Sequence, residues 1–182
     1  MKVISRAAAH FEQFVQDCTD SLLATAYLLT RDRQAAEELV QDTLVALYPQ
    51  WSKVAQAQSP IAYVRRSLIN RYLNQQRRGS ASELVTDFTA ARAPERRPGP
   101  DFAHRIDDRD QLRRVLSTLP ARQRAAVVLR YFHDLSDDQV AEAMGCRVGT
   151  VRSLISRALS TLRGDAAFTG LDGHSDQQGA TR

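Results

Sequence analysis

The feature that most constrains the fold is an interruption in the helical pattern of apolar residues. On both sides of it apolar residues recur at spacings of three and four, and no segment shows the sustained alternation of a half-buried strand. Between residues 79 and 105 this rhythm stops, and the run ARAPERRPGP is too rich in proline, arginine and alanine to pack into a core. The sequence therefore predicts an all-α protein of two small helical domains joined by a flexible linker.

The predicted N-terminal domain spans residues 1–78, the linker 79–105 and the C-terminal domain 106–163, and we expect the polar tail at 164–182 to be disordered. In the N-terminal domain, apolar stripes predict helices over about residues 11–29, 33–48 and 60–77. Asp32 is expected to cap the second helix, and Trp51 is expected to lie in the core. The polar residues 52–59 are predicted to connect the second and third helices.

Residues 135–163, LSDDQVAEAMGCRVGTVRSLISRALSTLR, have the form of a helix-turn-helix. Ser136 and Gln139 form a capping-box pair at the start of the first helix, and Gly145 supplies the left-handed residue that the turn needs. The second helix begins near Val148 and has an apolar face opposite an acid-free outer face. Arginine and short polar side chains on such a face are typical of a helix in the major groove. The predicted DNA-binding residues are Arg147, Thr150, Arg152, Ser153, Ser156 and Arg157.

The distribution of charge supports a polyanionic partner. The formal net charge of +4 is weak evidence by itself, but residues 43–82 and 143–164 contain several arginines and no Asp or Glu. Lys2 and Lys53 are the only lysines, and the planar guanidinium of arginine suits phosphates and guanine edges. A GC-rich genome would explain the excess of arginine equally well, but it would not explain the clustering.

Other classes of site are not indicated. Cys18 and Cys146 lie far apart without a CxxC partner and the four histidines are scattered, so we predict no disulfide framework, no metal site and no cofactor. No stretch approaches the roughly 20 apolar residues of a membrane span, and the N-terminus lacks the pattern of a signal peptide. We therefore expect a cytoplasmic protein without membrane insertion.

The C-terminal segment resembles the fourth conserved region of the extracytoplasmic-function (group 4) sigma factors of bacterial RNA polymerase, in the sigma-70 family and of the actinobacterial sigma-E-like type. By this resemblance the domain binds the minus 35 promoter element and the polymerase flap. Two positions depart from the family pattern: Arg147 stands where a capping serine is common, and Leu154 where arginine or glutamine is common. The residues that carry the likeness are Leu119-Pro120, Arg130-Tyr131, Leu135-Ser136, Val140-Ala141-Glu142, Gly149-Thr150-Val151, Ser153 and Arg157-Ala158.

The N-terminal segment resembles sigma region 2 in two places. Residues 35–48, AAEELVQDTLVALY, are similar to the helix that docks on the clamp helices of the large polymerase subunit. The alternative is that the acids here only complement a helix N-terminal dipole. The resemblance assigns polymerase binding to Glu37, Glu38, Gln41 and Asp42.

Residues 60–78, PIAYVRRSLINRYLNQQRR, are similar to the region that reads the minus 10 element. Asn70 and Asn74 match the polar positions of that family and share one helix face, while the arginines are suited to phosphates. The same resemblance implies that residues 52–59, with the start of the next helix, capture an unstacked base, and Tyr48, Trp51 and Tyr63 are the nearby aromatics. The predicted minus 10 residues are Arg65, Arg66, Asn70, Arg71, Asn74, Arg77 and Arg78.

The resemblance implies a sigma factor, which is no enzyme: it binds core RNA polymerase, contacts promoter DNA at both elements and assists melting. It also implies an anti-sigma factor as a partner. A stand-alone helix-turn-helix regulator is the alternative, although residues 1–78 show no receiver-like pattern or long dimerisation helix. A DNA-acting enzyme using Tyr63 or Tyr72 is disfavoured, because no histidine or carboxylate lies near them in sequence.

Overall fold

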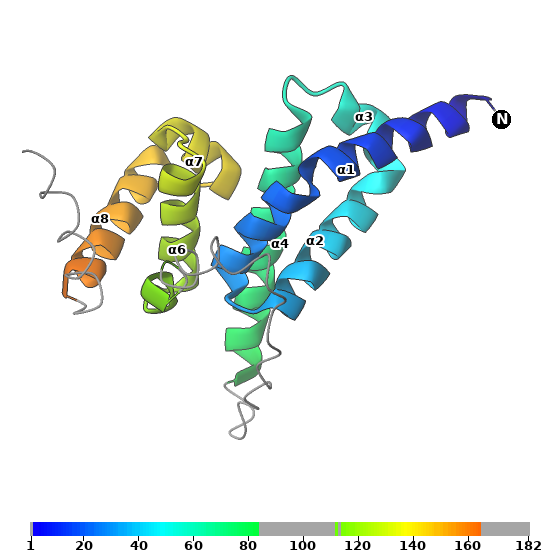
Figure 1. Ribbon diagram of the computed structural model, residues 1–182. Coiled ribbons are helices and arrows are strands. Elements are labelled where there is room, and N and C mark those ends of the chain that lie inside the picture. The colour runs from blue at the N-terminus through cyan, green and yellow to red at the C-terminus, as the bar shows by residue number, and fades with distance from the viewer. Residues whose placement is uncertain (1, 84–111, 113, 165–182) are drawn as a thin grey trace, which may run out of the picture.

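The computed structural model describes residues 2–83, 112 and 114–164 (Figure 1). Helices and turns account for these residues and no strand occurs among them, which confirms the all-α prediction. None of the helices in this part of the chain is long and apolar enough to cross a membrane. The predicted linker beyond residue 83 and the predicted tail beyond residue 164 lie outside the described residues.

The N-terminal unit, residues 2–83, is a bundle in which α1 and α2 run antiparallel and α4 packs beside both (Figure 1). Its buried side chains come from all of these helices and include Leu29, Leu39, Leu68 and Tyr72. The elements are α1 (Lys2–Thr30), α2 (Arg33–Leu47), a 3-10 turn η1 (Tyr48–Gln50), α3 (Trp51–Ala55) and α4 (Pro60–Glu83).

The turn between α1 and α2 forms where the sequence predicts it. Arg31 adopts a left-handed conformation with φ of 66°, and Asp32 caps α2 by accepting a hydrogen bond from the Ala35 amide at 2.8 Å. Trp51 is buried, as predicted, against the rings of Phe11 and Phe14. These contacts close the end of the bundle opposite that turn.

Two local predictions need correction. The connection predicted over residues 52–59 is shorter, because Trp51–Ala55 form the helix α3, held by the burial of Trp51 and Val54. The sequence predicts that the third helix ends near Arg77 and that the linker begins at Gly79, but α4 continues to Glu83. A single glycine costs a helix only about 1 kcal/mol relative to alanine, so it does not end one by itself.

The C-terminal unit, residues 112 and 114–164, packs its helices around a second set of buried side chains. Residues 114–117 are helical and precede α6 (Ala121–Val127), a π-helical turn η3 (Val128–Phe132), α7 (Asp137–Met144) and α8 (Val148–Gly164). Asp134, with φ of 49°, ends the π-helical turn.

The helix-turn-helix is confirmed. The Ser136 hydroxyl accepts from the Gln139 amide, and the Gln139 side chain accepts from the Ser136 amide at 2.9 Å, so the capping box is complete. Gly145 is left-handed, with φ of 60°, and leads into α8. The predicted apolar face of α8 is buried and consists of Val151, Ile155, Ala158 and Leu162.

The two units lie against one another, with α7 and α6 contacting α4 and with α6 and η3 contacting α1. Arg124 of α6 lies at the centre of this contact and is 5% exposed. Its guanidinium donates to the carbonyls of Leu116 and Leu119 in its own unit, and to the Leu29 carbonyl and the Tyr72 hydroxyl in the other. A buried guanidinium needs such acceptors, so Arg124 joins the units.

A second polar contact crosses the same boundary. The Nε2 atom of His133 lies 2.8 Å from the Thr25 hydroxyl of α1. Burial, with a contribution from the charge of Arg65, lowers the pKa of His133 to about 4. His133 is therefore neutral at pH 7 while the units are packed together.

Candidate nucleic-acid interface

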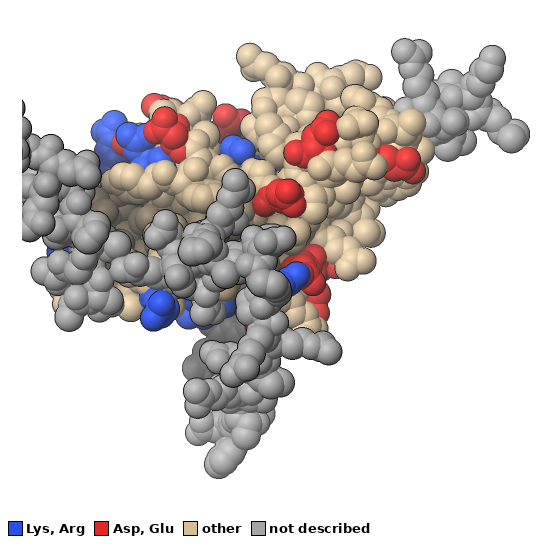
Figure 2. All heavy atoms as spheres, viewed as in Figure 1, with Lys and Arg blue, Asp and Glu red and all other residues tan. Residues whose placement is uncertain are grey.

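The outer face of α8 is open to solvent. The apolar face opposite it packs on α6 and α7, which leaves the polar side chains pointing away from the unit. On the face drawn in Figure 2, most visible Lys and Arg lie over the C-terminal unit and most visible Asp and Glu over α1 and α2. All of the predicted minus 35 residues are exposed and lie on α8 or just before it: Arg147, Thr150, Arg152, Ser153, Ser156 and Arg157.

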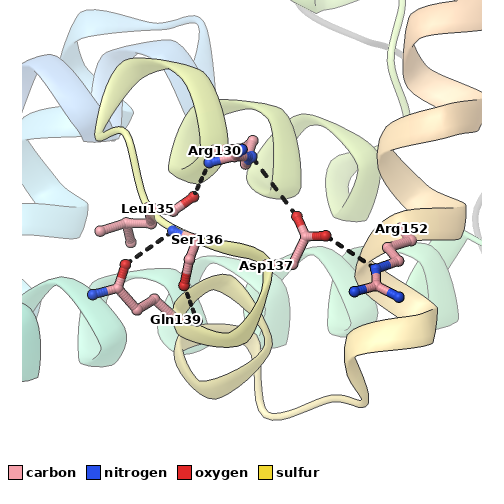
Figure 3. Close-up of polar contacts among 6 residues, drawn as sticks. All are labelled: Arg130, Leu135, Ser136, Asp137, Gln139 and Arg152. Carbon is pink, nitrogen blue, oxygen red and sulfur yellow. Dashed lines mark hydrogen bonds and ion pairs between the residues drawn. The ribbon is translucent and has the colours of Figure 1, made fainter.

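One residue on this face has an ionic partner. The Nε atom of Arg152 lies 3.1 Å from Oδ2 of Asp137, the first residue of α7, while Oδ1 of Asp137 lies 3.7 Å from Nε of Arg130 (Figure 3). Arg130 is held in turn by donation to the Leu135 carbonyl at 2.7 Å. The Asp137 carboxylate therefore links Arg130 of the π-helical turn η3 to Arg152 on the exposed face of α8.

The predicted minus 10 residues lie on α4, where Arg66, Asn70, Asn74 and Arg77 follow one face at helical spacing. The other three predicted residues, Arg65, Arg71 and Arg78, point away from that face. Asn74 and Arg77 are exposed and hydrogen-bonded to each other, and Asn70 is half-buried.

Part of this face is occupied by the C-terminal unit. The Nη1 atom of Arg66 lies 3.2 Å from Oε1 of Glu142 on α7, and both side chains remain largely exposed. Arg65 is half-buried, and burial lowers the pKa of its guanidinium. Arg71 lies 3.9 Å from Asp42 of α2. Within the chain, Arg66 is thus engaged by α7 and Arg71 by α2.

The predicted polymerase-binding residues share the exposed side of α2. Glu37 pairs with Arg33 at 2.9 Å and Glu38 accepts from Gln34 at 3.0 Å, each pair being one helical turn apart. Exposed pairs of this kind contribute little to stability, so these side chains remain accessible to a partner. The face is completed by Gln41 and Asp42, and beyond them by the exposed apolar side chains of Val45 and Tyr48.

The three aromatic side chains near residues 52–59 differ in their exposure to solvent. Trp51 is 3% exposed and belongs to the core, as expected. Tyr48 is 48% exposed and forms a T-shaped contact with the Phe11 ring at a centroid distance of 4.9 Å, while Tyr63 is half-buried. Of the three, Tyr48 offers the most accessible surface for stacking.

The sequence did not indicate four residues that contact the predicted site or join the two units. Asp137 and Glu142 look like solvated helix acids, and His133 looks isolated, because their partners are distant in sequence. Arg124 had a usable signal, since it directly precedes the apolar run from Ala125 to Leu129. A charge at the edge of a buried stretch requires several hydrogen-bond acceptors in the fold.

Comparison with known families agrees with this geometry. Residues 14–82 match the family model described as Sigma-70 region 2, and residues 109–162 match the model described as Sigma-70, region 4. The two matches cover the N-terminal bundle and the helix-turn-helix respectively.

Curated relatives match along most of their length. The chain is 34% identical over 162 residues to an RNA polymerase sigma-E factor of Streptomyces coelicolor, covering 89% of each protein. It is 29% identical over 163 residues to an ECF RNA polymerase sigma factor, SigE, of Mycolicibacterium smegmatis, covering 86% of this chain and 62% of that protein.

A solved structure shares the arrangement of helices. The sigma factor RpoE of Bartonella quintana, in a co-crystal structure with the anti-sigma factor NepR, superposes with a TM-score of 0.62 at 26% identity, covering 85% of this chain and 95% of that chain. The chain belongs to the sigma-70 family, as an alternative sigma factor of the extracytoplasmic-function class that directs RNA polymerase to promoters.

Proposed function

We propose that α8 reads the minus 35 element from the major groove. The observation that carries this proposal is the exposed, acid-free outer face of a capped and buried helix-turn-helix. Arginine forks suit guanine edges and phosphates, and the hydroxyls of Thr150, Ser153 and Ser156 are short enough to allow close approach to the bases. Arg147, Arg152 and Arg157 supply the cations on this face.

The same proposal gives α4 the minus 10 element and a part in melting. Asn70 and Asn74 carry amides that can pair with base edges, and arginines flank them along the helix. Arg77 and Arg78 are exposed in the packed arrangement, whereas Arg66 is engaged by Glu142 of α7 and Arg65 is half-buried. Minus 10 contact by this helix therefore depends on the relation between the two units.

Both elements cannot be bound in the packed arrangement. The minus 35 and minus 10 elements are separated by about 25 base pairs, which is about 85 Å of duplex at about 3.4 Å per base pair. In the structure α4 and α7 are in direct contact, with Arg66 paired to Glu142. We expect the units to separate when the chain joins core polymerase at a promoter.

Core polymerase would bind on two surfaces. The acidic and polar side of α2, with Glu37, Glu38, Gln41 and Asp42, is suited to the clamp helices. In the C-terminal unit the exposed rings of Tyr131 and Phe132, at the end of η3, are suited to the flap. An anti-sigma factor would hold the protein inactive in the cytoplasm, and the protein itself would act by binding, with no catalytic step.

The deciding experiment is transcription with purified core RNA polymerase on a library of randomised promoter templates. The expected result is initiation that depends on this protein and selects templates sharing an upstream and a downstream motif. Absence of protein-dependent initiation from every template would contradict the proposal. Sequence-specific DNA binding without polymerase, together with no initiation, would favour a stand-alone regulator.

The role of α4 is tested by Asn70→Ala, with Gln75→Ala as the matched exposed amide on the same helix. Asn70→Ala should reduce open-complex formation by about tenfold or more, the loss of roughly one good base contact, while leaving polymerase binding unchanged. Permanganate reactivity of the melted strand and co-elution with core polymerase measure these two properties. Equal open-complex yields for Asn70→Ala and Gln75→Ala would contradict the assignment.

A further inference from the structure

The Asp137 carboxylate is held between two arginines of the C-terminal unit. Arg130 approaches Oδ1 at 3.7 Å and Arg152 approaches Oδ2 at 3.1 Å (Figure 3). Asp137 is fixed by its place in the first turn of α7 and is 29% exposed, whereas Arg152 is 70% exposed. The restrained partner in this pair is the acid, and the partner that reaches toward solvent is the arginine.

The contact to Asp137 uses a specific atom of Arg152. Its Nε–H donates to the carboxylate, and no other pairing of Arg152 occurs among the described residues. The two terminal nitrogens of the guanidinium have no partner among the described residues, and the side chain is 70% exposed. A planar fork of this kind is the geometry that binds O6 and N7 of a guanine in the major groove.

We infer that Asp137 is a positioning residue that sets promoter specificity by holding the Arg152 fork for bidentate contact with a guanine of the minus 35 element. This inference rests on the proposed function of α8. An unrestrained arginine loses substantial rotamer entropy when it binds and can shift to a neighbouring phosphate, which carries no sequence information. A restrained arginine loses less entropy and is limited to one base pair.

The pair is better explained by positioning than by stability. Exposed ion pairs contribute at most about 1 kcal/mol to folding, and Arg152 is mostly exposed. An acid in the first turn also interacts with the helix dipole, but Asp138 supplies the same interaction one residue later. Asp138 faces solvent without an ionic partner among the described residues, so it provides the matched control.

The test compares Asp137→Asn with Asp138→Asn in reconstituted holoenzyme, by sequencing transcripts from a library randomised across the minus 35 element. Asp137→Asn should lower discrimination at one guanine position by roughly 5- to 100-fold, the value of one bidentate base contact, with preferences elsewhere unchanged. Asp138→Asn should keep the wild-type profile. Both variants remove one negative charge, so a change caused only by net charge would appear in both and would overturn the inference.

A double variant separates positioning from a structural role. Arg152→Ala should flatten the same position, and adding Asp137→Asn to it should cause no further loss, because the carboxylate then has no fork to hold. Additive losses, or a uniform loss at every position, would overturn the inference. If Arg152→Ala leaves base preference intact while initiation persists, the positioning role fails and the sigma function stands. Absence of any initiation that depends on the wild-type protein would contradict both the positioning role and the sigma function.

Discussion

The two helices that we assign to DNA binding differ in how accessible their DNA-binding faces are. The outer face of α8 is exposed along its length, and the intramolecular partner of Arg152 is an acid at its edge. The corresponding face of α4 packs partly against α7, with Arg66 paired to Glu142 and Arg65 half-buried. Similar residue types are thus available on one helix and partly occupied on the other. Access to α4 depends on the contact between units, so variants of that contact test the comparison most directly.

The largest effect is expected from Arg124→Met. Removing the guanidinium leaves carbonyls of both units and the Tyr72 hydroxyl without their donor, and leaving buried acceptors unsatisfied in this way typically costs about 3 kcal/mol. Urea unfolding should show a loss of that size, and energy transfer between dyes on α2 and α8 should report separated units. Arg122→Met, an exposed neighbour on α6, should behave as wild type.

If Arg124→Met is too unstable to isolate, Arg124→Lys offers a milder change that keeps the charge but loses the fork. It should still reduce the energy transfer. A stable, fully closed Arg124→Lys protein would show that the contact between units does not depend on these hydrogen bonds.

The next effect concerns α8. Arg152→Ala should weaken minus 35 binding by about 1 to 3 kcal/mol if the residue reads a base. Because this face is already open, the loss should be the same in a background that also carries Arg124→Lys, in which the units separate. Competition binding of holoenzyme to promoter fragments measures it, with Arg163→Ala at the end of α8 as the control. An equal loss for Arg163→Ala would indicate general charge attraction.

A smaller effect should follow from pH. The packed arrangement lowers the pKa of His133 to about 4 from an ordinary value of 6.5. Protonation of His133 is therefore disfavoured in the closed form, in which the two units pack together, and favoured in the open form, in which they are separated. Closure should be fully present above pH 6.5 and should weaken by about 1 kcal/mol between pH 7.5 and pH 5.5.

Energy transfer measured across that pH range reports the weakening. His133→Asn should remove the pH dependence, while His10→Asn, in the N-terminal unit, should keep it. An unchanged slope in His133→Asn would assign the titration to another group.

The smallest effect is expected from breaking the exposed ion pair between Arg66 and Glu142. Arg66→Ala should favour the open form by less than about 1 kcal/mol, since both partners are largely exposed. Glu142→Ala should open the units to the same extent while leaving Arg66 free for phosphate. Holoenzyme with Glu142→Ala should therefore retain minus 10 binding, whereas Arg66→Ala should lose part of it. Arg78→Ala serves as the control for an arginine of α4 that is already exposed.

Local features were predictable because their causes lie within a few residues. The caps at Asp32 and Ser136, the left-handed Gly145 and the buried stripe of α8 each depend on neighbours in sequence. Element ends were less predictable. The helix α3 exists because Trp51 is buried against the rings of α1, and the polar composition of the surrounding residues conceals this.

Contacts between distant residues could not be read from periodicity. The acceptors of Arg124 in the N-terminal unit lie 52 and 95 residues away, and Glu142 is 76 residues from Arg66. A helical pattern shows which face is buried but not which polar groups of another unit meet it. The division into two helical units was therefore accessible from sequence, and the covered state of α4 was not.

The acceptors of Arg124 determine how the contact between the two units responds to ionic strength. All of them are uncharged oxygens inside the protein, whereas mobile ions screen exposed charges within about 8 Å at physiological salt. Added salt therefore weakens phosphate contacts by α4 and α8 steeply, through the return of counterions to the DNA. It leaves the centre of the closed arrangement almost untouched. Rising salt thus shifts the population from the DNA-bound form toward the closed form, in which part of α4 is covered.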